Sequence, residues 1–360
     1  MKKIFVSDCE GPISKNDNAF EVTSRFVPDG NRLFTVVSRY DDVLAEVVKK
    51  PGYEAGDTLK LILPFLKAYG VTDGKMREFS SQHLACIPGI KDTLQYVRSL
   101  APAFIVSASY EHYLKALCKV LEFPFENAYC TRVCLDKYGI RDDEREELKQ
   151  ITKEIVQIPA FEVPPHAESL DNLPKKDRET MRRLDEIFWK RIVEMEIGRV
   201  YCEVNPVGGG EKARAIENIV HRSSVAVADV MYVGDSITDD EAFKLVERED
   251  GLTVSFNGNQ YAVRNAEIAV LSEDSIVTAV IADAFLRSGK PEVLDLVEGW
   301  NRETLEKSSV NRGLVERLFR AYPGKLPKVK IVTDQNMEAL ALESSRFRNR
   351  VRGEAVGRLG

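Results

Sequence analysis

The chain has 360 residues, of which 44% are hydrophobic and 30% are charged, a composition typical of a soluble globular protein. Its formal net charge of −6 excludes the overall positive charge that attracts nucleic acid or an anionic membrane. The apolar run near the N-terminus is too short for a signal peptide, and no stretch approaches a membrane span, so we expect a cytoplasmic protein.

The six cysteines are scattered, at positions 9, 86, 118, 130, 134 and 202. They show neither the pairing of a secreted disulfide scaffold nor the CxxC…CxxC spacing of a zinc site. We therefore expect free thiols in a reducing compartment.

The first predicted element is an apolar strand over residues 4–6, which runs into Asp8, Glu10 and the dipeptide Gly11-Pro12. Two interpretations are open for this stretch: an ordinary acidic turn, or a catalytic pair of acids at the end of a strand. The residues themselves do not separate the two.

Helical runs fill residues 13–87, and a helix is predicted between the two prolines of 87–102. A second strand follows in "APAFIVSASY" (101–110), where Ser107 ends the apolar run. The stretch 137–199 is dense in alternating charges, which favours a solvated, salt-bridged helical pair over a substrate pocket.

Two further strands are predicted, in "RVYCEVNPVGGG" (199–210) and "VADVMYVGDSITDD" (227–240). Lys212 follows the first, at the start of a helical run, and Asp235 and Asp239 follow the second. The chain beyond 285 has a helical, charged pattern and carries five arginines between residues 344 and 360.

Strands that alternate with helices predict an α/β fold with a doubly wound, mostly parallel sheet. The expected organisation is a core formed by 1–12, 88–136 and 200–284, a helical cap (13–87), a charged helical insert (137–199) and a helical C-terminal extension (285–360). Ligands bind at the carboxyl ends of such strands, so we expect Asp8, Ser107, Lys212 and Asp235 along one edge of the sheet.

This set suits phosphoryl transfer through a carboxylate, which needs a nucleophilic acid, a second acid–base group, a divalent cation and donors for the phosphate oxygens. The segments "DCEGP", "FIVSASY", Lys212 after a glycine turn, and "VGDSITD" also resemble, in order, the four motifs of the haloacid dehalogenase (HAD) superfamily of phosphatases and phosphotransferases. The helical insertion, and the pattern up to "IVSAS", resemble its phosphoserine-phosphatase branch.

The resemblance implies that Asp8 is the nucleophile, Glu10 the acid–base group, and Ser107 and Lys212 phosphate-binding residues. It also implies a Mg²⁺ ion held by a carboxylate of Asp8, the carbonyl of Glu10 and Asp235, with Asp239 in or just behind that shell.

Glu10 departs from the family, most of whose phosphatases have Asp there, although enolase-phosphatases and a phosphoserine–homoserine phosphotransferase branch resemble it with D-x-E-G. Substrate choice would lie in the cap, where Arg25, Arg32 and Arg39 are candidates; surface solvation is the alternative for these arginines.

Two functions are therefore open. The first is a Mg²⁺-dependent phosphatase or phosphotransferase acting on a small phosphorylated metabolite. The second is a HAD-fold accessory or regulatory subunit, as suggested by a resemblance to archaeal HAD proteins, some described as accessory to a hydrogenase. We expect no nucleic acid or membrane partner; the basic C-terminal extension would dock on the protein's own acidic surface, on a second copy or on a protein partner.

Overall fold

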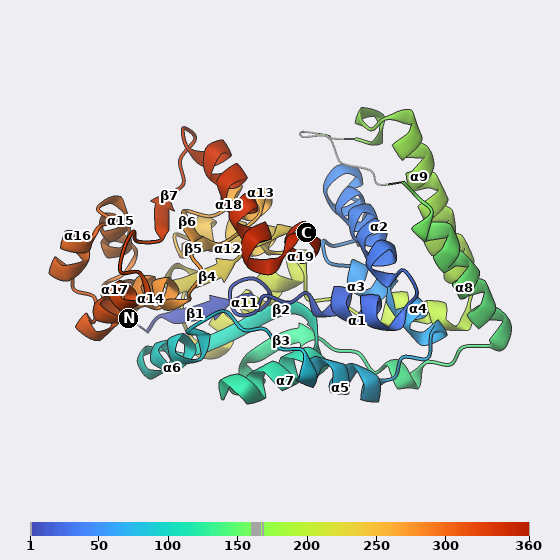
Figure 1. The fold of residues 1–360 in the computed structure, drawn as a ribbon, viewed down its shortest axis with the longest axis horizontal. Coiled ribbons are helices and arrows are strands. Elements are labelled where there is room, and N and C mark those ends of the chain that lie inside the picture. The colour runs from blue at the N-terminus through green and yellow to red at the C-terminus, as the bar shows by residue number, and fades with distance from the viewer. Residues whose placement is uncertain (1, 160–166, 168, 360) are drawn as a thin grey trace.

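The computed structural model describes residues 2–159, 167 and 169–359, and its centre is a seven-stranded sheet (Figure 1). The strands lie in the order β3-β2-β1-β4-β5-β6-β7, and every neighbouring pair is parallel except β6 with β7. Their bounds are β1 (Ile4–Ser7), β2 (Ala103–Tyr110), β3 (Ala128–Thr131), β4 (Val230–Gly234), β5 (Leu252–Phe256), β6 (Ile268–Leu271) and β7 (Lys328–Ile331).

Helices cover both faces of the sheet, which explains why its central strands are apolar on both sides. Along β1, Phe5 packs on one face while Ile4 and Val6 pack on the other, as the alternation of a strand requires. The first face is covered by α6 (Ile90–Leu100), α7 (Glu111–Leu121) and α14 (Ile276–Ser288), and the second by α11 (Gly209–Ser223), α12 (Asp240–Arg248) and α13 (Gln260–Arg264). The predicted doubly wound α/β fold is confirmed.

The order of the strands creates a switch point beside β1. The chain first adds β2 and β3 on one side of β1, and later returns to add β4, β5 and β6 on the other side. Open α/β sheets bind ligands where the order reverses in this way, at the carboxyl ends of the strands. The segments that follow β1 and β4 therefore lie at the expected place for a site.

One predicted strand is wrong. Within 199–210, Val200–Glu203 form the short helix α10. Val200, Tyr201 and Val204 all enter the buried cluster of the cap, and their spacing of one and four residues puts them on one side of a helical turn. Packing against the cap thus overrides the β-branched composition of this stretch.

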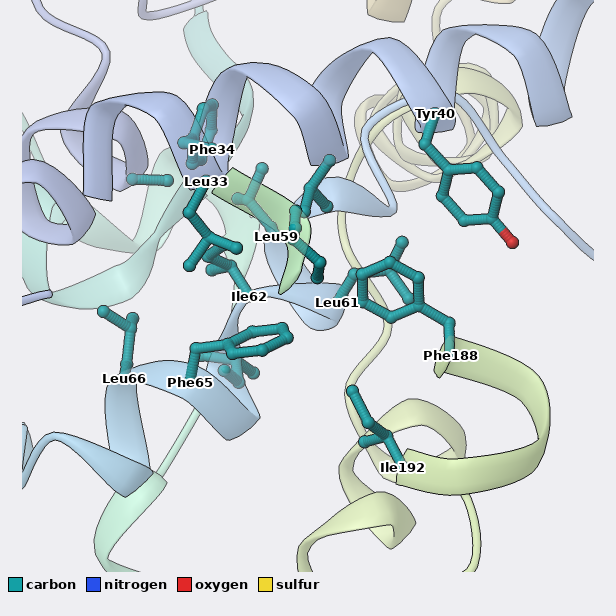
Figure 2. Packing of buried hydrophobic residues seen from close by; sticks show 14 of the residues in the cluster. Leu33, Phe34, Tyr40, Leu59, Leu61, Ile62, Phe65, Leu66, Phe188 and Ile192 are labelled. Atoms are coloured by element: carbon teal, nitrogen blue, oxygen red, sulfur yellow. The ribbon is translucent and has the colours of Figure 1, made fainter. Parts of the chain in front are cut away.

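The cap and the charged insert pack together as one helical body. Tyr40 of α2 and Phe188 of the insert stack with ring centroids 5.4 Å apart, and Figure 2 shows Phe188 between Tyr40 and Phe65, next to Leu61. The insert also carries the expected ion pairs on its outer side, such as Arg191 with Glu154 at 3.1 Å. The helices are α1 (Asn18–Phe26), α2 (Gly30–Asp42), η1 (Val43–Val48), α3 (Thr58–Leu61), α4 (Leu63–Ala68) and α5 (Asp73–Gln82) from the cap, and α8 (Asp142–Val156), α9 (Lys175–Glu186) and η5 (Ile187–Ile192) from the insert.

The C-terminal extension contains a strand that the helical pattern did not predict. β7 pairs antiparallel with β6; it is a short edge strand whose Lys328 and Lys330 alternate with the buried Val329. The helices are α15 (Lys290–Glu298), α16 (Arg302–Lys307), α17 (Arg312–Ala321), α18 (Met337–Arg352) and α19 (Glu354–Gly357). α18 packs along α13 and β6, and Figure 1 shows α18 and α19 between the sheet and the helical body. None of the described helices is long and apolar enough to cross a membrane.

Candidate active site

Three buried carboxylates meet at the switch point. Asp8 directly follows β1, Asp235 directly follows β4, and Asp239 closes the short helix η8 (Ile237–Asp239). One oxygen of each lies within 4.8 Å of the others. The strand register explains the meeting: Ser7 pairs with Val233, so Asp8 emerges level with Gly234, one residue before Asp235.

Asp239 organises the loop behind the other two acids. Its Oδ2 accepts hydrogen bonds from the backbone N–H groups of Asp235 and Ser236, both at 2.9 Å. Its Oδ1 accepts from the Tyr232 hydroxyl at 2.6 Å and from Lys212 Nζ at 2.7 Å. Both oxygens are thus engaged within the protein, which places Asp239 as a residue that orients Asp235 and Lys212.

Lys212 lies in the first turn of α11 and its side chain is fully buried. Its Nζ lies 2.8 Å from Oδ2 of Asp8 and 2.7 Å from Oδ1 of Asp239. Burial alone would lower the pKa of Lys212, but the carboxylates of Asp239 and Asp8 outweigh it and raise that pKa. The ammonium is therefore a permanent positive charge between two acids.

The glycines before Lys212 allow the helix to start against the cap. A β-carbon on Gly208 would lie 2.2 Å from the carbonyl oxygen of Ala55, and Gly209 has φ of +44°. Neither position accommodates a side chain without a shift of the backbone.

Asp8 is held at both carboxylate oxygens. The backbone N–H of Cys9 donates to Oδ1 at 2.6 Å, while Lys212 pairs with Oδ2. Burial raises the pKa of Asp8 to about 6, and the neighbouring Lys212 ammonium offsets part of that shift. Asp8 is thus ionised near neutral pH and kept in one orientation.

Glu10 has the opposite protonation state. Its Oε1 accepts from the backbone N–H of Asn18, at the start of α1, at 2.7 Å. Burial, followed by the carboxylate of Asp17, raises the pKa of Glu10 to about 8, against the opposing effects of the Asn18 N–H and Arg352. A carboxyl group that is protonated at neutral pH can donate a proton.

Ser107 lies inside β2 rather than at its end, because the strand continues to Tyr110. It is buried, and its Oγ accepts from the backbone N–H of Ser109 at 3.2 Å. Ser107 lines the same cavity as Asp8 and Asp235.

That cavity has a volume of about 80 Å³ and lies between the sheet, the cap and the C-terminal extension. The cap contributes Phe34, Asp41 and Leu59, and the extension contributes Leu359 together with two arginines. Arg25, Arg32 and Arg39, the cap arginines proposed from the sequence, do not line it.

The two arginines that do line the cavity, Arg348 and Arg352 of α18, were not among the residues predicted from the sequence. Arg348 donates from Nη1 to both Oδ2 and the backbone oxygen of Asp235, and Arg352 Nη1 lies 3.0 Å from the same Oδ2. Residues four apart share one face of a helix, and these two are the arginines of the basic stretch that face inward. Arg346 and Arg350 have the same spacing and are exposed, so spacing alone does not select the buried pair.

The donor set suits a hard divalent cation. Carboxylate oxygens are the ligands that Mg²⁺ prefers, and Asp8 and Asp235 present them at the cavity with Asp239 directly behind. The side chain of Glu10 is engaged with Asn18, so the contribution expected of Glu10 is its backbone carbonyl.

Comparison with solved structures finds a match over the whole fold. The structure of gene product AF1437 from Archaeoglobus fulgidus is 26% identical in sequence, covers 100% of this chain and 99% of its own, and superposes with a TM-score of 0.81. The match therefore includes the helical cap, the charged insert and the C-terminal extension.

Two more distant matches are a substrate-bound phosphoserine phosphatase complex and a HAD family hydrolase from Salmonella enterica serovar Typhi. The first is 14% identical over 76% of this chain and 95% of its own, with a TM-score of 0.47; the second is 11% identical over 73% and 65%, with a TM-score of 0.44. No protein-family model matches the chain, and no curated protein was found to be similar.

Proposed function

We propose that this protein is a HAD-type phosphatase or phosphotransferase that acts on a small phosphorylated metabolite through an aspartyl-phosphate on Asp8. The observation that carries the proposal is the contact of Asp8 with Lys212, beside Asp235, at the switch point of the sheet. The order of the four sequence motifs supports it independently.

In the first half of the reaction, the Asp8 carboxylate attacks phosphorus and the bond from phosphorus to the leaving oxygen breaks. Glu10, whose pKa is raised to about 8 by burial, gives its proton to that oxygen. Lys212 and the hydroxyl of Ser107 hold the phosphate oxygens.

In the second half, the Glu10 carboxylate takes a proton from water, whose oxygen attacks phosphorus and releases Asp8. A hydroxyl group of a second substrate replaces water in a phosphotransferase. Mg²⁺ held by Asp8, Asp235 and the carbonyl of Glu10 would neutralise the negative charge shared by these acids and the phosphate.

The cavity is small, at about 80 Å³, and lies between the sheet, the cap and the C-terminal extension. This enclosure favours a phosphate group on a small metabolite over a polymer.

Phosphate release from a panel of phosphorylated metabolites, with and without Mg²⁺, tests the proposal. Asp8→Asn should abolish release, whereas Asp334→Asn, which changes an exposed acid outside the site, should leave it unchanged. Borohydride trapping should label Asp8 in the wild type. Activity that survives Asp8→Asn would rule out the mechanism.

One observation favours a second candidate, a role as an accessory or regulatory subunit. Arg348 and Arg352 form ion pairs with Asp235 and neutralise its charge. An expected metal ligand that is already paired in this way is consistent with a site that does not catalyse a reaction. A stoichiometric partner recovered with the full chain, together with no release from any phosphoester, would favour this second function.

A further inference from the structure

The two arginines of α18 hold Asp235 in a buried ion-pair cluster. The side chains of Arg348, Arg352 and Asp235 are 3%, 4% and 1% exposed, and Oδ2 of Asp235 accepts from both guanidinium groups. These residues lie 113 and 117 positions apart in the chain, so the pairing is built by the fold rather than by local sequence.

Backbone carbonyl groups fix both guanidinium groups in place. Arg348 donates from Nε to the carbonyl of Gly357 at 3.1 Å and from Nη2 to that of Leu359 at 3.3 Å. Arg352 donates from Nε to the carbonyl of Lys15 at 3.1 Å. Arginines with so many donors satisfied are held at this position and are not merely close to it.

The segment that carries the arginines is anchored at both ends. At the start of α18, Leu340 and Ala341 pack against Val263 of α13. At the other end, Leu359 is buried in the core cluster of the cap. The segment 337–359, which we call the C-terminal plug, therefore bridges the sheet and the cap across the cavity.

The plug supplies positive charge where the site is most acidic. Arg348 faces Asp235 directly, and Asp17, Asp8 and Glu10 are close enough to act on its charge. A divalent cation on Asp235 would share the carboxylate whose Oδ2 both arginines hold, and it would lie beside two like charges in a buried environment. The arginines and the cation are therefore alternatives at Asp235.

We propose that the C-terminal plug controls the loading of the metal: Arg348 and Arg352 close the site to divalent cations, and Mg²⁺ binds when the plug withdraws from Asp235. An effect of the plug on catalysis depends on the proposed function. The competition between Mg²⁺ and the two arginines for Asp235 does not depend on it.

Direct measurement of Mg²⁺ binding by isothermal titration calorimetry, without substrate, tests the competition. The double variant Arg348→Met with Arg352→Met should bind Mg²⁺ about tenfold or more tightly than the wild type, within the usual range of coupling between two sites. Arg350→Met is the matched control, because it removes an exposed charge from the same helix and should bind as the wild type does. Adding Asp235→Asn to the double variant should abolish binding.

Equal affinity of the folded double variant and the wild type, or no binding by the folded double variant, would overturn the proposal. Because loss of both arginines leaves Asp235 buried without a counter-ion and can prevent folding, hydrogen exchange of the wild type provides a second measurement. Addition of Mg²⁺ should speed exchange in residues 337–359 and leave α15 to α17 unchanged. Unchanged exchange of the plug across the Mg²⁺ titration would also overturn the proposal.

Neither measurement uses a phosphoester. A protein that loads Mg²⁺ as described but hydrolyses nothing would retain the plug and lose the proposed function. If the protein hydrolyses phosphoesters and its affinity for Mg²⁺ does not depend on Arg348 and Arg352, the proposed function stands and the role of the plug is wrong.

Discussion

Gly11 packs directly against Asp235: a β-carbon on Gly11 would lie 2.1 Å from Oδ2 of that carboxylate. The φ angle of Gly11 is +107°, a backbone conformation that other residues rarely adopt. The loop after β1 can therefore approach the end of β4 only with glycine at this position. The two strand ends that carry Asp8 and Asp235 depend on this contact.

Gly11→Ala should consequently lower the free energy of unfolding, by about 3 kcal/mol, since it combines a strained backbone with a clash. Gly74→Ala is the control: its β-carbon would meet only Oγ1 of Thr72 at 3.6 Å, within helix α5, and alanine there should stabilise by about 0.5–1 kcal/mol. Urea denaturation measures both. Equal effects of the two substitutions would show that the contact with Asp235 does not constrain position 11.

Lys212→Met should abolish turnover and should also destabilise the fold. The substitution leaves the buried carboxylates of Asp8 and Asp239 without their shared counter-ion, which typically costs about 3–5 kcal/mol. Lys244→Met provides the comparison, because Lys244 pairs with Asp240 at the surface and should contribute about 1 kcal/mol or less. Urea denaturation and phosphate release are the two measurements, and a Lys212→Met protein as stable as the Lys244→Met protein would contradict the assignment.

The acids of the site could be predicted from the sequence because their signals are local. Asp8 and Asp235 each follow a short apolar run, which is typical of a buried strand. A parallel sheet brings the ends of such strands to one edge. The position of Lys212 was also predicted, although for the wrong reason: the stretch before it forms α10 and not a strand. The prediction of Lys212 depended only on the helix α11, which begins at Gly209, and not on the element before it.

The arginines of the site could not be predicted in the same way. Nothing near Arg348 in the sequence indicates that α18 returns to the carboxyl end of β4, because that path depends on the edge strand β7 and on packing against α13. The packing of the charged insert on the cap is also a long-range effect. The charged residues of the insert do not indicate that its apolar residues pack on α2. Local periodicity predicts elements and their buried faces, whereas the tertiary structure determines which elements pack together.

The shared core of the two inserts leads to a further prediction. Phe188→Ala should destabilise the helical body by about 3–5 kcal/mol, because Phe188 is fully buried between Tyr40 and Phe65. Hydrogen exchange should also become faster in α2, although α2 belongs to the other insert. Val193→Ala, an exposed position close by in the same insert, should change neither quantity appreciably. Exchange in α2 that is unaffected by Phe188→Ala would indicate that the inserts fold separately.

The last prediction concerns the dependence of stability on pH at Asp41, a cap residue beside the cavity. Asp41 is buried, its Oδ2 accepts from the backbone N–H of Gly56 at 2.9 Å, and Asp42 is its neighbour. Burial, followed by the Asp42 carboxylate, raises the pKa of Asp41 from 3.8 to about 7. Between these pH values the folded protein retains a proton that the unfolded chain has already released.

The stabilising contribution of Asp41 is therefore complete below pH 3.8 and is lost as the pH rises to about 7. Asp41→Asn should remove this dependence, so that the difference in free energy of unfolding between the wild type and the variant changes by a few kcal/mol, in favour of the variant, as the pH rises from 4 to 7. Asp334→Asn, an exposed position, should follow the wild type at every pH. Urea denaturation at a series of pH values measures the difference, and parallel curves for Asp41→Asn and the wild type would show that the carboxyl group of Asp41 is already ionised at pH 4 in the folded protein.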